Sequence, residues 1–129
     1  MRLLLDTCVF LWMISGDSRL PSGAEAHLRD GSNHVWLSSV SNWEISVKES
    51  TGRLVLPEPS ERYVPRNRLR HQIRSLSMDE KSVAHQGRLP WLHRDPFDRM
   101  LICQAIENEL TIVTPDHLIR QYPVRTLWD

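Results

Sequence analysis

HRDPFDRMLICQA, residues 93–105, is the stretch that decides how this chain folds. It begins as a helix should, because Asp95 suits the N-cap position and Pro96 suits the first helical position. Apolar residues then recur at helical spacing: Phe97, Leu101, Ile102, Ala105 and Ile106. The stretch therefore predicts a helix that starts at Pro96 and buries one face in the core.

Asp98 stands on the first turn of this predicted helix, where a carboxylate can serve either of two purposes. Taken alone, its placement fits a favourable interaction with the helix dipole, worth about 0.3–1 kcal/mol. However, Asp6, Glu44 and Asp116 each stand just after an apolar strand or early in the helix that follows one. Acids from four separated segments are hard to explain as helix caps, so we predict that they share a site.

Length and composition fit a single globular domain over residues 1–129. Hydrophobic residues make up 40% of the chain and charged residues 25%, which is typical of soluble proteins. The longest apolar run, residues 8–14, is far shorter than the roughly 20 residues that a membrane span needs. Residues 1–5 lead into Asp6 without the apolar core of a signal peptide, so we expect a cytoplasmic protein and no membrane partner.

The positions of the cysteines, histidines and arginines limit the kinds of catalytic, metal or nucleic-acid site that the chain can form. Cys8 and Cys103 lack the spacing of a zinc site, and we expect both to be buried free thiols. Neither cysteine lies in an electropositive turn, which disfavours a cysteine–histidine nucleophile, and the six histidines show no paired ligand spacing. Acidic and basic residues balance at 16 each, a mild argument against nucleic-acid binding, although residues 62–74 hold five arginines and no acid.

Short apolar runs alternate with helical segments along the chain. Strands are predicted over residues 2–5, 34–37, 73–76, 110–114 and 124–128. Helices are predicted over residues 7–14, 22–29, 42–48, 60–72 and 78–87, from residue 96 onward, and in a short segment ending at residue 121. This alternation predicts an α/β domain with a mainly parallel sheet. The segment 7–14 has more apolar residues than one core-facing stripe needs, so it is either covered by a partner or buried on two sides.

The four acids predict a metal site. Ligands of open parallel sheets bind beyond the carboxyl ends of the strands, at the point where the strand order reverses. If the strands that end near Asp6 and Thr114 are neighbours, the four acids crowd one edge and repel one another unless protonated or bound to a cation. Oxygen ligands of this kind suit Mg²⁺ or Mn²⁺. One or two such ions activate water and stabilise a leaving oxygen, so phosphodiester hydrolysis is the predicted chemistry.

The chain also resembles PIN-domain proteins, and more narrowly the VapC-type ribonuclease toxins of VapBC toxin–antitoxin systems. Four stretches carry the resemblance in family order: LLLDT (residues 3–7), SNWEISVK (41–48), HRDPFDR (93–99) and TIVTPD (111–116). The resemblance implies a PIN-like α/β/α sandwich with a central, mainly parallel five-stranded sheet.

The resemblance also implies which residues form the site. Four acids are the expected catalytic residues: Asp6, Glu44, Asp98 and Asp116. Of these, Asp6, Asp98 and Asp116 are the expected metal ligands. Thr114 matches a position whose hydroxyl often lies near such a site. Lys48 and Arg99 are candidates at its rim, where they contact phosphate or pair with carboxylates; Glu44 and Lys48 also stand four residues apart, as in a helix-surface ion pair.

The function implied is that of a metal-dependent endoribonuclease, the toxin of a type II toxin–antitoxin pair. Its expected partners are an RNA substrate, a cognate VapB-type antitoxin and a second copy of the chain. The arginine segment 62–74 is then a candidate RNA-phosphate contact surface, or simply a solvated helix face. A non-catalytic PIN-fold module that binds RNA or protein is the alternative. A phosphoaspartate phosphatase is disfavoured, because Cys8 stands where that chemistry usually needs a second aspartate.

Overall fold

β1 (Arg2–Leu5) lies at the centre of a five-stranded sheet in the computed structural model, which describes residues 1–129. The other strands are β2 (His34–Ser38), β3 (Arg74–Leu76), β4 (Thr111–Val113) and β5 (Thr126–Leu127). The strand order is β3-β2-β1-β4-β5, with β3 and β5 at the edges, and every neighbouring pair is parallel. The predicted parallel sheet is confirmed.

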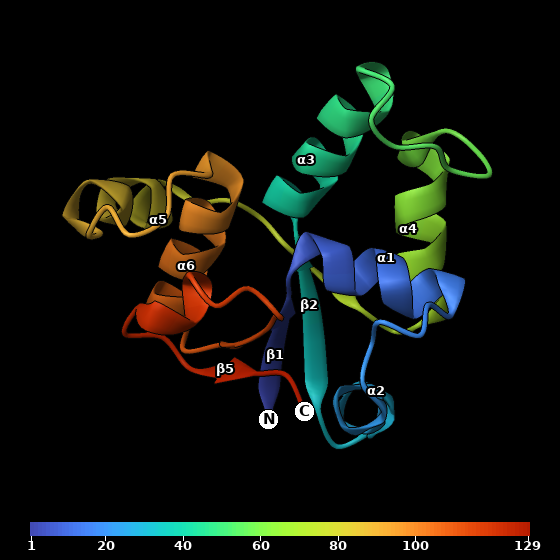
Figure 1. Cartoon of the computed structure of the whole chain (residues 1–129), viewed down its shortest axis with the longest axis horizontal. Helices are drawn as coiled ribbons and strands as arrows, with labels where there is room; N and C mark the ends of the chain where they lie inside the picture. The colour runs from blue at the N-terminus through green and yellow to red at the C-terminus, as the bar shows by residue number, and fades with distance from the viewer.

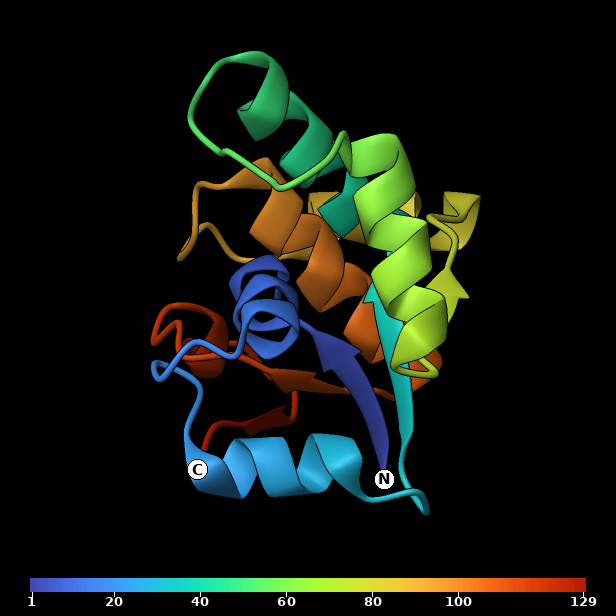
Figure 2. The same ribbon diagram turned by 90° about the vertical axis from the view of Figure 1, so that its right-hand side faces the viewer.

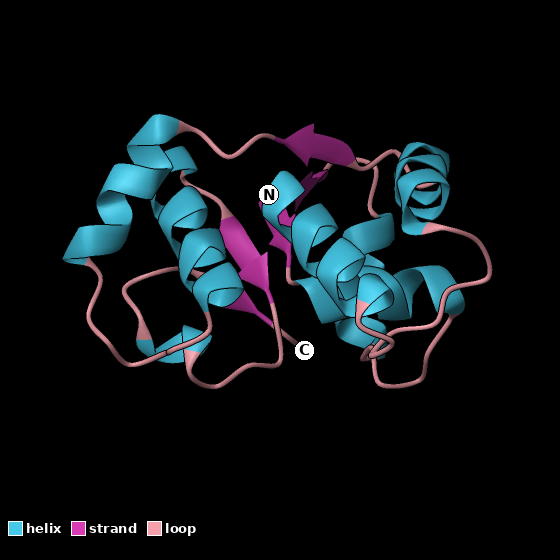
Figure 3. Ribbon diagram, turned by 90° about the horizontal axis from the view of Figure 1, so that it is seen from above, coloured by secondary structure: helices cyan, strands magenta, loops and turns pink.

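Helices cover both faces of this sheet. They are α1 (Thr7–Ser15), α2 (Ser22–Arg29), α3 (Ser39–Ser50), α4 (Ser60–Arg70), α5 (Glu80–His85) and α6 (Pro96–Asn108). Two 3-10 helices span Gln86–Arg88 and Ile119–Gln121. Figure 1 shows α1, α3 and α4 on one side of β1 and β2 and α5 and α6 on the other, and Figure 3 shows the strands between the two groups. The predicted α/β/α sandwich is confirmed, with α2 at the amino ends of the strands (Figure 2).

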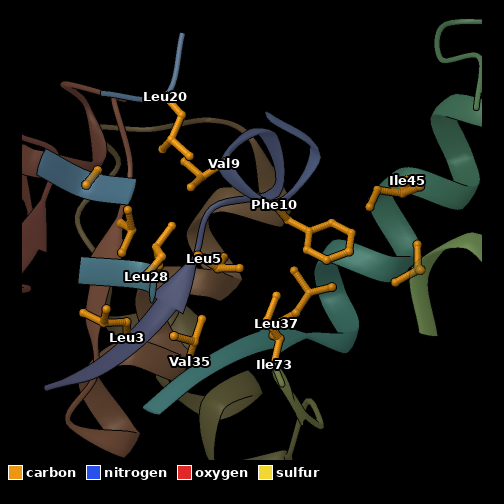
Figure 4. Packing of buried hydrophobic residues seen from close by; sticks show 13 residues of the cluster. Leu3, Leu5, Val9, Phe10, Leu20, Leu28, Val35, Leu37, Ile45 and Ile73 are labelled. Atoms are coloured by element: carbon orange, nitrogen blue, oxygen red, sulfur yellow. The ribbon is translucent and has the colours of Figure 1, made fainter. Parts of the chain in front are cut away.

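Two apolar clusters fill the space between the helices and the sheet. Because side chains alternate along a strand, Leu3 and Leu5 point to one face and Leu4 points to the other. The first cluster joins β1 and β2 to α1 and α2, with Phe10 fully buried (Figure 4). The second joins β1 and β4 to α6, which contributes Leu101 among others. All three leucines that follow Arg2 are thus buried in the core.

α3 and α2 begin in different ways, the first with a side-chain cap and the second without one. The predicted helix over 42–48 starts earlier, at Ser39, because the Ser38 hydroxyl accepts a hydrogen bond from the backbone N–H of Val40 at 3.0 Å. The N-cap residue of α2 is Pro21, which offers no side-chain acceptor, and Ser22 is the first residue of that helix.

α1 carries the surplus of apolar side chains that the sequence showed. Val9 and Phe10 are buried, and Trp12 is partly buried against Trp128, with 6.0 Å between ring centroids. The chain itself therefore covers part of that surplus. Cys103 is a buried free thiol as predicted, whereas the free thiol of Cys8 is only half-buried, so that part of the prediction was wrong.

The helix predicted over 60–72 ends at Arg70. Pro65 lies inside it, and because its backbone nitrogen carries no hydrogen it cannot donate a hydrogen bond to the preceding turn. None of the helices has the length and apolar character that crossing a bilayer requires.

Candidate active site

The strand order reverses at β1, because the chain moves outward through β2 and β3 and then returns to the other side for β4 and β5. Ligand sites of open parallel sheets lie beyond the carboxyl ends of the strands at such a point. Leu5 at the end of β1 pairs with Val113 at the end of β4. Asp6 and Thr114 therefore follow neighbouring strands, which is the condition on which the predicted acidic site depends.

Thr114 connects the acids that follow these two strands. Its buried hydroxyl donates a hydrogen bond to Asp6 Oδ2 at 2.7 Å and accepts one from the backbone N–H of Asp116 at 3.0 Å. Asp116 Oδ1 in turn accepts from the backbone N–H of Leu118 at 2.8 Å. The hydroxyl thus lies beside the acids, and it holds the Asp6 carboxylate in one orientation.

The start of α6 brings a third acid to the same place. The Asp95 side chain accepts hydrogen bonds from the backbone N–H groups of Phe97 at 2.8 Å and Asp98 at 3.2 Å, so it is the N-cap that the sequence predicted. Phe97 packs edge-on against Trp43 of α3, with 4.8 Å between ring centroids. This contact joins the beginnings of α3 and α6, and the next residue of each, Glu44 and Asp98, lines the same pocket.

The pocket has a volume of about 680 Å³ and opens at the carboxyl edge of the sheet. All four predicted acids line it: Asp6, Glu44, Asp98 and Asp116. Asp6 and Glu44 are buried, whereas Asp98 and Asp116 are half-buried. The structure therefore brings together acids that lie in four separate parts of the sequence.

Burial and crowding change the proton affinity of these acids. Burial raises the pKa of Asp98 to about 8, and the charges of Asp6 and other nearby acids add to the effect. Burial also raises the pKa of Asp6 to about 6, although the hydrogen bond from Thr114 opposes it. For Asp116, hydrogen bonds from His93 and a backbone N–H outweigh burial and hold the pKa below its ordinary value. Both raised pKa values come from burial and neighbouring negative charge, and a cation bound between these acids would oppose them.

Glu44 has one carboxylate oxygen without a partner. Its Oε2 lies 2.8 Å from the Lys48 Nζ, so the predicted helix ion pair forms. Its Oε1 is buried and makes no hydrogen bond. An unpaired buried carboxylate oxygen is costly, and a cation in the pocket would supply the missing partner. The oxygen donors of the four acids fit a hard divalent cation.

His93 belongs to the site although no role was predicted for it. Its Nε2 lies 2.9 Å from Asp116 Oδ2 and 3.0 Å from Asp98 Oδ2. The donor atoms of these three residues all lie within 4.8 Å of one another, close enough to hold a metal ion. The histidines were set aside because none is paired at ligand spacing in the sequence. The one feature of the sequence that could have pointed to His93 is its place as the first residue of the stretch 93–105.

Arg99 is the predicted site residue that the structure places elsewhere. It is only 1% exposed, and its guanidinium donates to the carbonyl oxygen of Pro90 at 2.9 Å and to Gln86 Oε1 at 2.8 Å. The prediction of Arg99 at the rim was therefore wrong, because one residue along a helix turns the side chain away from the face that carries Asp98. Lys48 does line the pocket, and so does Arg53, which the sequence reasoning missed.

The arginine segment 62–74 lies away from the pocket lining. Arg66 is paired with Glu58 at 2.8 Å, and Arg68 donates to the carbonyl oxygen of Ile73 at 3.1 Å. The half-buried Cys8 does line the pocket, but burial and the charges of Asp6 and its neighbours raise the pKa of its thiol. A thiol kept protonated in this way is a poor nucleophile.

The fold and the pocket together define an α/β protein with an acidic site able to bind a cation. The PIN domain family matches residues 3–124, so the chain belongs to that family. A segment of 61 residues is 39% identical to the ribonuclease VapC16 of Mycobacterium tuberculosis, and this segment covers 47% of the chain and 43% of that relative. The match thus spans less than half the length of the curated relative.

Solved structures confirm the fold. The chain is similar to VapBC2 from Rickettsia felis bound to a DNA fragment from its promoter, with a TM-score of 0.74, 17% identity and 100% of each chain covered. It is also similar to DNA-bound VapBC from Salmonella typhimurium, with a TM-score of 0.70, 17% identity and coverage of 98% of this chain and 97% of the other.

Proposed function

We propose that this chain is a metal-dependent endoribonuclease that hydrolyses RNA phosphodiester bonds, with Mg²⁺ as cofactor and Mn²⁺ as an alternative. The observation that carries the proposal is the pocket in which four acids converge, with the buried Oε1 of Glu44 left without a partner. Asp6, Asp98 and Asp116 are the proposed metal ligands. The ribonuclease relative from M. tuberculosis supports RNA as the substrate.

The polar residues in and beside the pocket have different proposed roles. A bound divalent cation supplies polarisation of a phosphoryl oxygen and a lower pKa for a bound water. Thr114 orients Asp6 through its 2.7 Å hydrogen bond, and Asp95 fixes the helix turn that carries Asp98. Lys48 and Arg53 place positive charge on the pocket wall, where it can contact the phosphates of a substrate.

We also propose that residues 1–129 form one nuclease domain that acts as the toxin of a type II toxin–antitoxin pair. The family match over residues 3–124 supports a single domain. The fold shared with proteins from VapBC complexes supports a cognate VapB-type antitoxin as partner. A homodimer, and contact between the 62–74 segment and RNA, belong to the same proposal.

The test is cleavage of a mixed pool of tRNA and ribosomal RNA by the purified protein. We expect discrete products with Mg²⁺ and none with a chelator or with Asp98→Asn. Glu80→Gln is the matched control, because Glu80 is an exposed acid on α5 outside the pocket. If Asp98→Asn cuts at the wild-type rate, the assigned site is wrong. RNA or partner binding that needs no metal and gives no products would instead favour the non-catalytic module.

A further inference from the structure

A short loop before α6 is held in place by buried polar groups. The Arg99 guanidinium donates to the carbonyl oxygens of Pro90 at 2.9 Å and Gln86 at 3.1 Å, and it lies 3.7 Å from the centre of the Trp91 ring. The buried guanidinium thus fixes the backbone between residues 86 and 93. All of these contacts lie within the chain, so they form without a substrate.

Tyr122 fixes the same loop together with Arg99, whose Nη1 lies 3.4 Å from the tyrosine hydroxyl. Its hydroxyl oxygen accepts hydrogen bonds from the backbone N–H groups of Leu92 at 3.1 Å and His93 at 2.8 Å. The same hydroxyl donates to the carbonyl oxygen of Pro90 at 2.7 Å. The contacts with Arg99 and Tyr122 hold the loop where the His93 ring lies against Asp98 and Asp116, two acids that line the pocket.

The two ring nitrogens of His93 have different partners. Nδ1 accepts a hydrogen bond from the backbone N–H of Asp95 at 3.2 Å. A ring that accepts at Nδ1 carries its proton at Nε2, so the N–H group points at the Oδ2 atoms of Asp98 and Asp116. That geometry makes Nε2 a donor to the acids and leaves it no lone pair for a metal ion.

We infer that His93 is a positioning residue that holds Asp98 and Asp116 together through its Nε2–H, and is not itself a metal ligand. Two carboxylates that face one pocket repel each other, and a shared N–H donor keeps their Oδ2 atoms near one point. Partners of this kind that orient metal ligands usually change metal affinity by about 10–100-fold when removed. The inference rests on the proposed metal site and adds a residue to it.

Two variants separate this role from a purely structural one. His93→Gln keeps an amide N–H at the Nε2 position but loses the acceptor for the Asp95 amide. His93→Asn keeps that acceptor at the Nδ1 position but cannot reach the two carboxylates. Mn²⁺ alone is the probe: its dissociation constant is measured by calorimetry, and pulsed electron paramagnetic resonance detects any directly bound imidazole nitrogen.

We expect His93→Asn to bind Mn²⁺ about 10–100-fold more weakly than wild type and His93→Gln to bind it nearly as well. The wild-type spectrum should show no nitrogen coupling that the His93 variants lose; coupling from His117, which also lines the pocket, would persist in them. Three results would overturn the inference: wild-type nitrogen coupling that both variants lose, unchanged affinity in His93→Asn, or equal weakening in both variants. Failure of the proposed function gives a different result, because a protein without Mn²⁺ affinity has no metal site, and one that binds Mn²⁺ without cutting RNA is not a nuclease.

Discussion

Asp98 and Arg99 are neighbours on the first turn of α6, yet their side chains lie in opposite kinds of environment. The buried Arg99 finds its hydrogen-bond acceptors within the chain, on residues 86–93. Asp98 faces other acids in a pocket, and its pKa is raised to about 8. The guanidinium of Arg99 makes its hydrogen bonds within the chain, so it needs no ligand. The carboxylate of Asp98 lies among other acids without a counter-charge, and this environment favours the binding of a cation.

The largest expected effect tests the structural half of this comparison. Arg99→Met should lower the free energy of unfolding by about 3–5 kcal/mol, because several buried carbonyl oxygens lose their donor and each such loss costs about 1–3 kcal/mol. Urea unfolding measures the change. Arg88→Met is the control, because Arg88 is exposed and its nearest acid, Glu107, is 3.8 Å away. A loss below about 1 kcal/mol would show that the buried network contributes little more than a surface pair.

The next effect comes from the residue that connects two of the acids. Thr114→Val keeps the shape of the side chain but removes the donor to Asp6 and the acceptor for the Asp116 amide. We expect a loss of about 1.5–3 kcal/mol in unfolding free energy at pH 7.5, together with weaker Mn²⁺ binding. Thr111→Val on β4 is the matched control. Equal stability of the two variants would mean that Asp6 does not need the hydroxyl.

The pH dependence of the metal-free protein tests the functional half of the comparison. In the folded state Asp98 titrates near pH 8 and Asp6 near pH 6, whereas both titrate near 3.8 when unfolded. Between the unfolded and the folded pKa values, the folded chain therefore holds more protons than the unfolded chain. Its free energy of unfolding then falls as the pH rises from 5 to 9. We expect a fall of about 1–2 kcal/mol, less than the shifts alone imply, because water enters the open pocket.

Asp98→Asn should flatten that profile, because an amide cannot ionise. The variant and wild type should unfold at similar temperatures at pH 6, and the variant should be the more stable at pH 9. Thermal unfolding in the presence of a chelator measures both curves. A variant that is less stable than wild type at every pH would show that Asp98 makes structural hydrogen bonds.

The smallest effect on stability concerns the pocket wall. Lys48→Met leaves the Glu44 carboxylate, whose side chain is only 7% exposed, without its ion-pair partner. The unfolding free energy should fall by about 1 kcal/mol, the lower end for a buried acceptor that loses its partner, because the lysine is 41% exposed and water can take its place. If Lys48 contacts substrate phosphate, KM for RNA rises several-fold while kcat changes little. Lys81→Met on α5 is the control. Unchanged KM would restrict Lys48 to its pairing with Glu44.

The sequence predicted those features whose causes are local. The Asp95 cap and Pro96 start α6 because cap chemistry depends on neighbouring residues. The four acids could be grouped because each lies shortly after a strand or in the first half of a helix, and parallel strands end at a common edge. Helix starts were less certain, since the Ser38 cap lies just before the apolar pattern that defines α3.

The roles of His93 and Arg99 could not be predicted because they depend on contacts that form only when the chain is folded. His93 meets Asp116 only after β4 has paired with β1, and Tyr122 reaches the loop only after the chain has returned beside α6. A motif shows that such residues stand together in the sequence, but it does not show which side of the helix each one faces.

The short edges of the sheet limit how copies of this protein can associate. β3 has three residues and β5 has two, so neither edge offers a long row of free backbone groups to a strand of another chain. Growth of the sheet from molecule to molecule, which leads to fibres, is therefore disfavoured. Any stable dimer is expected to form through helices and side chains, where a change of sequence can alter the choice of partner without altering the sheet.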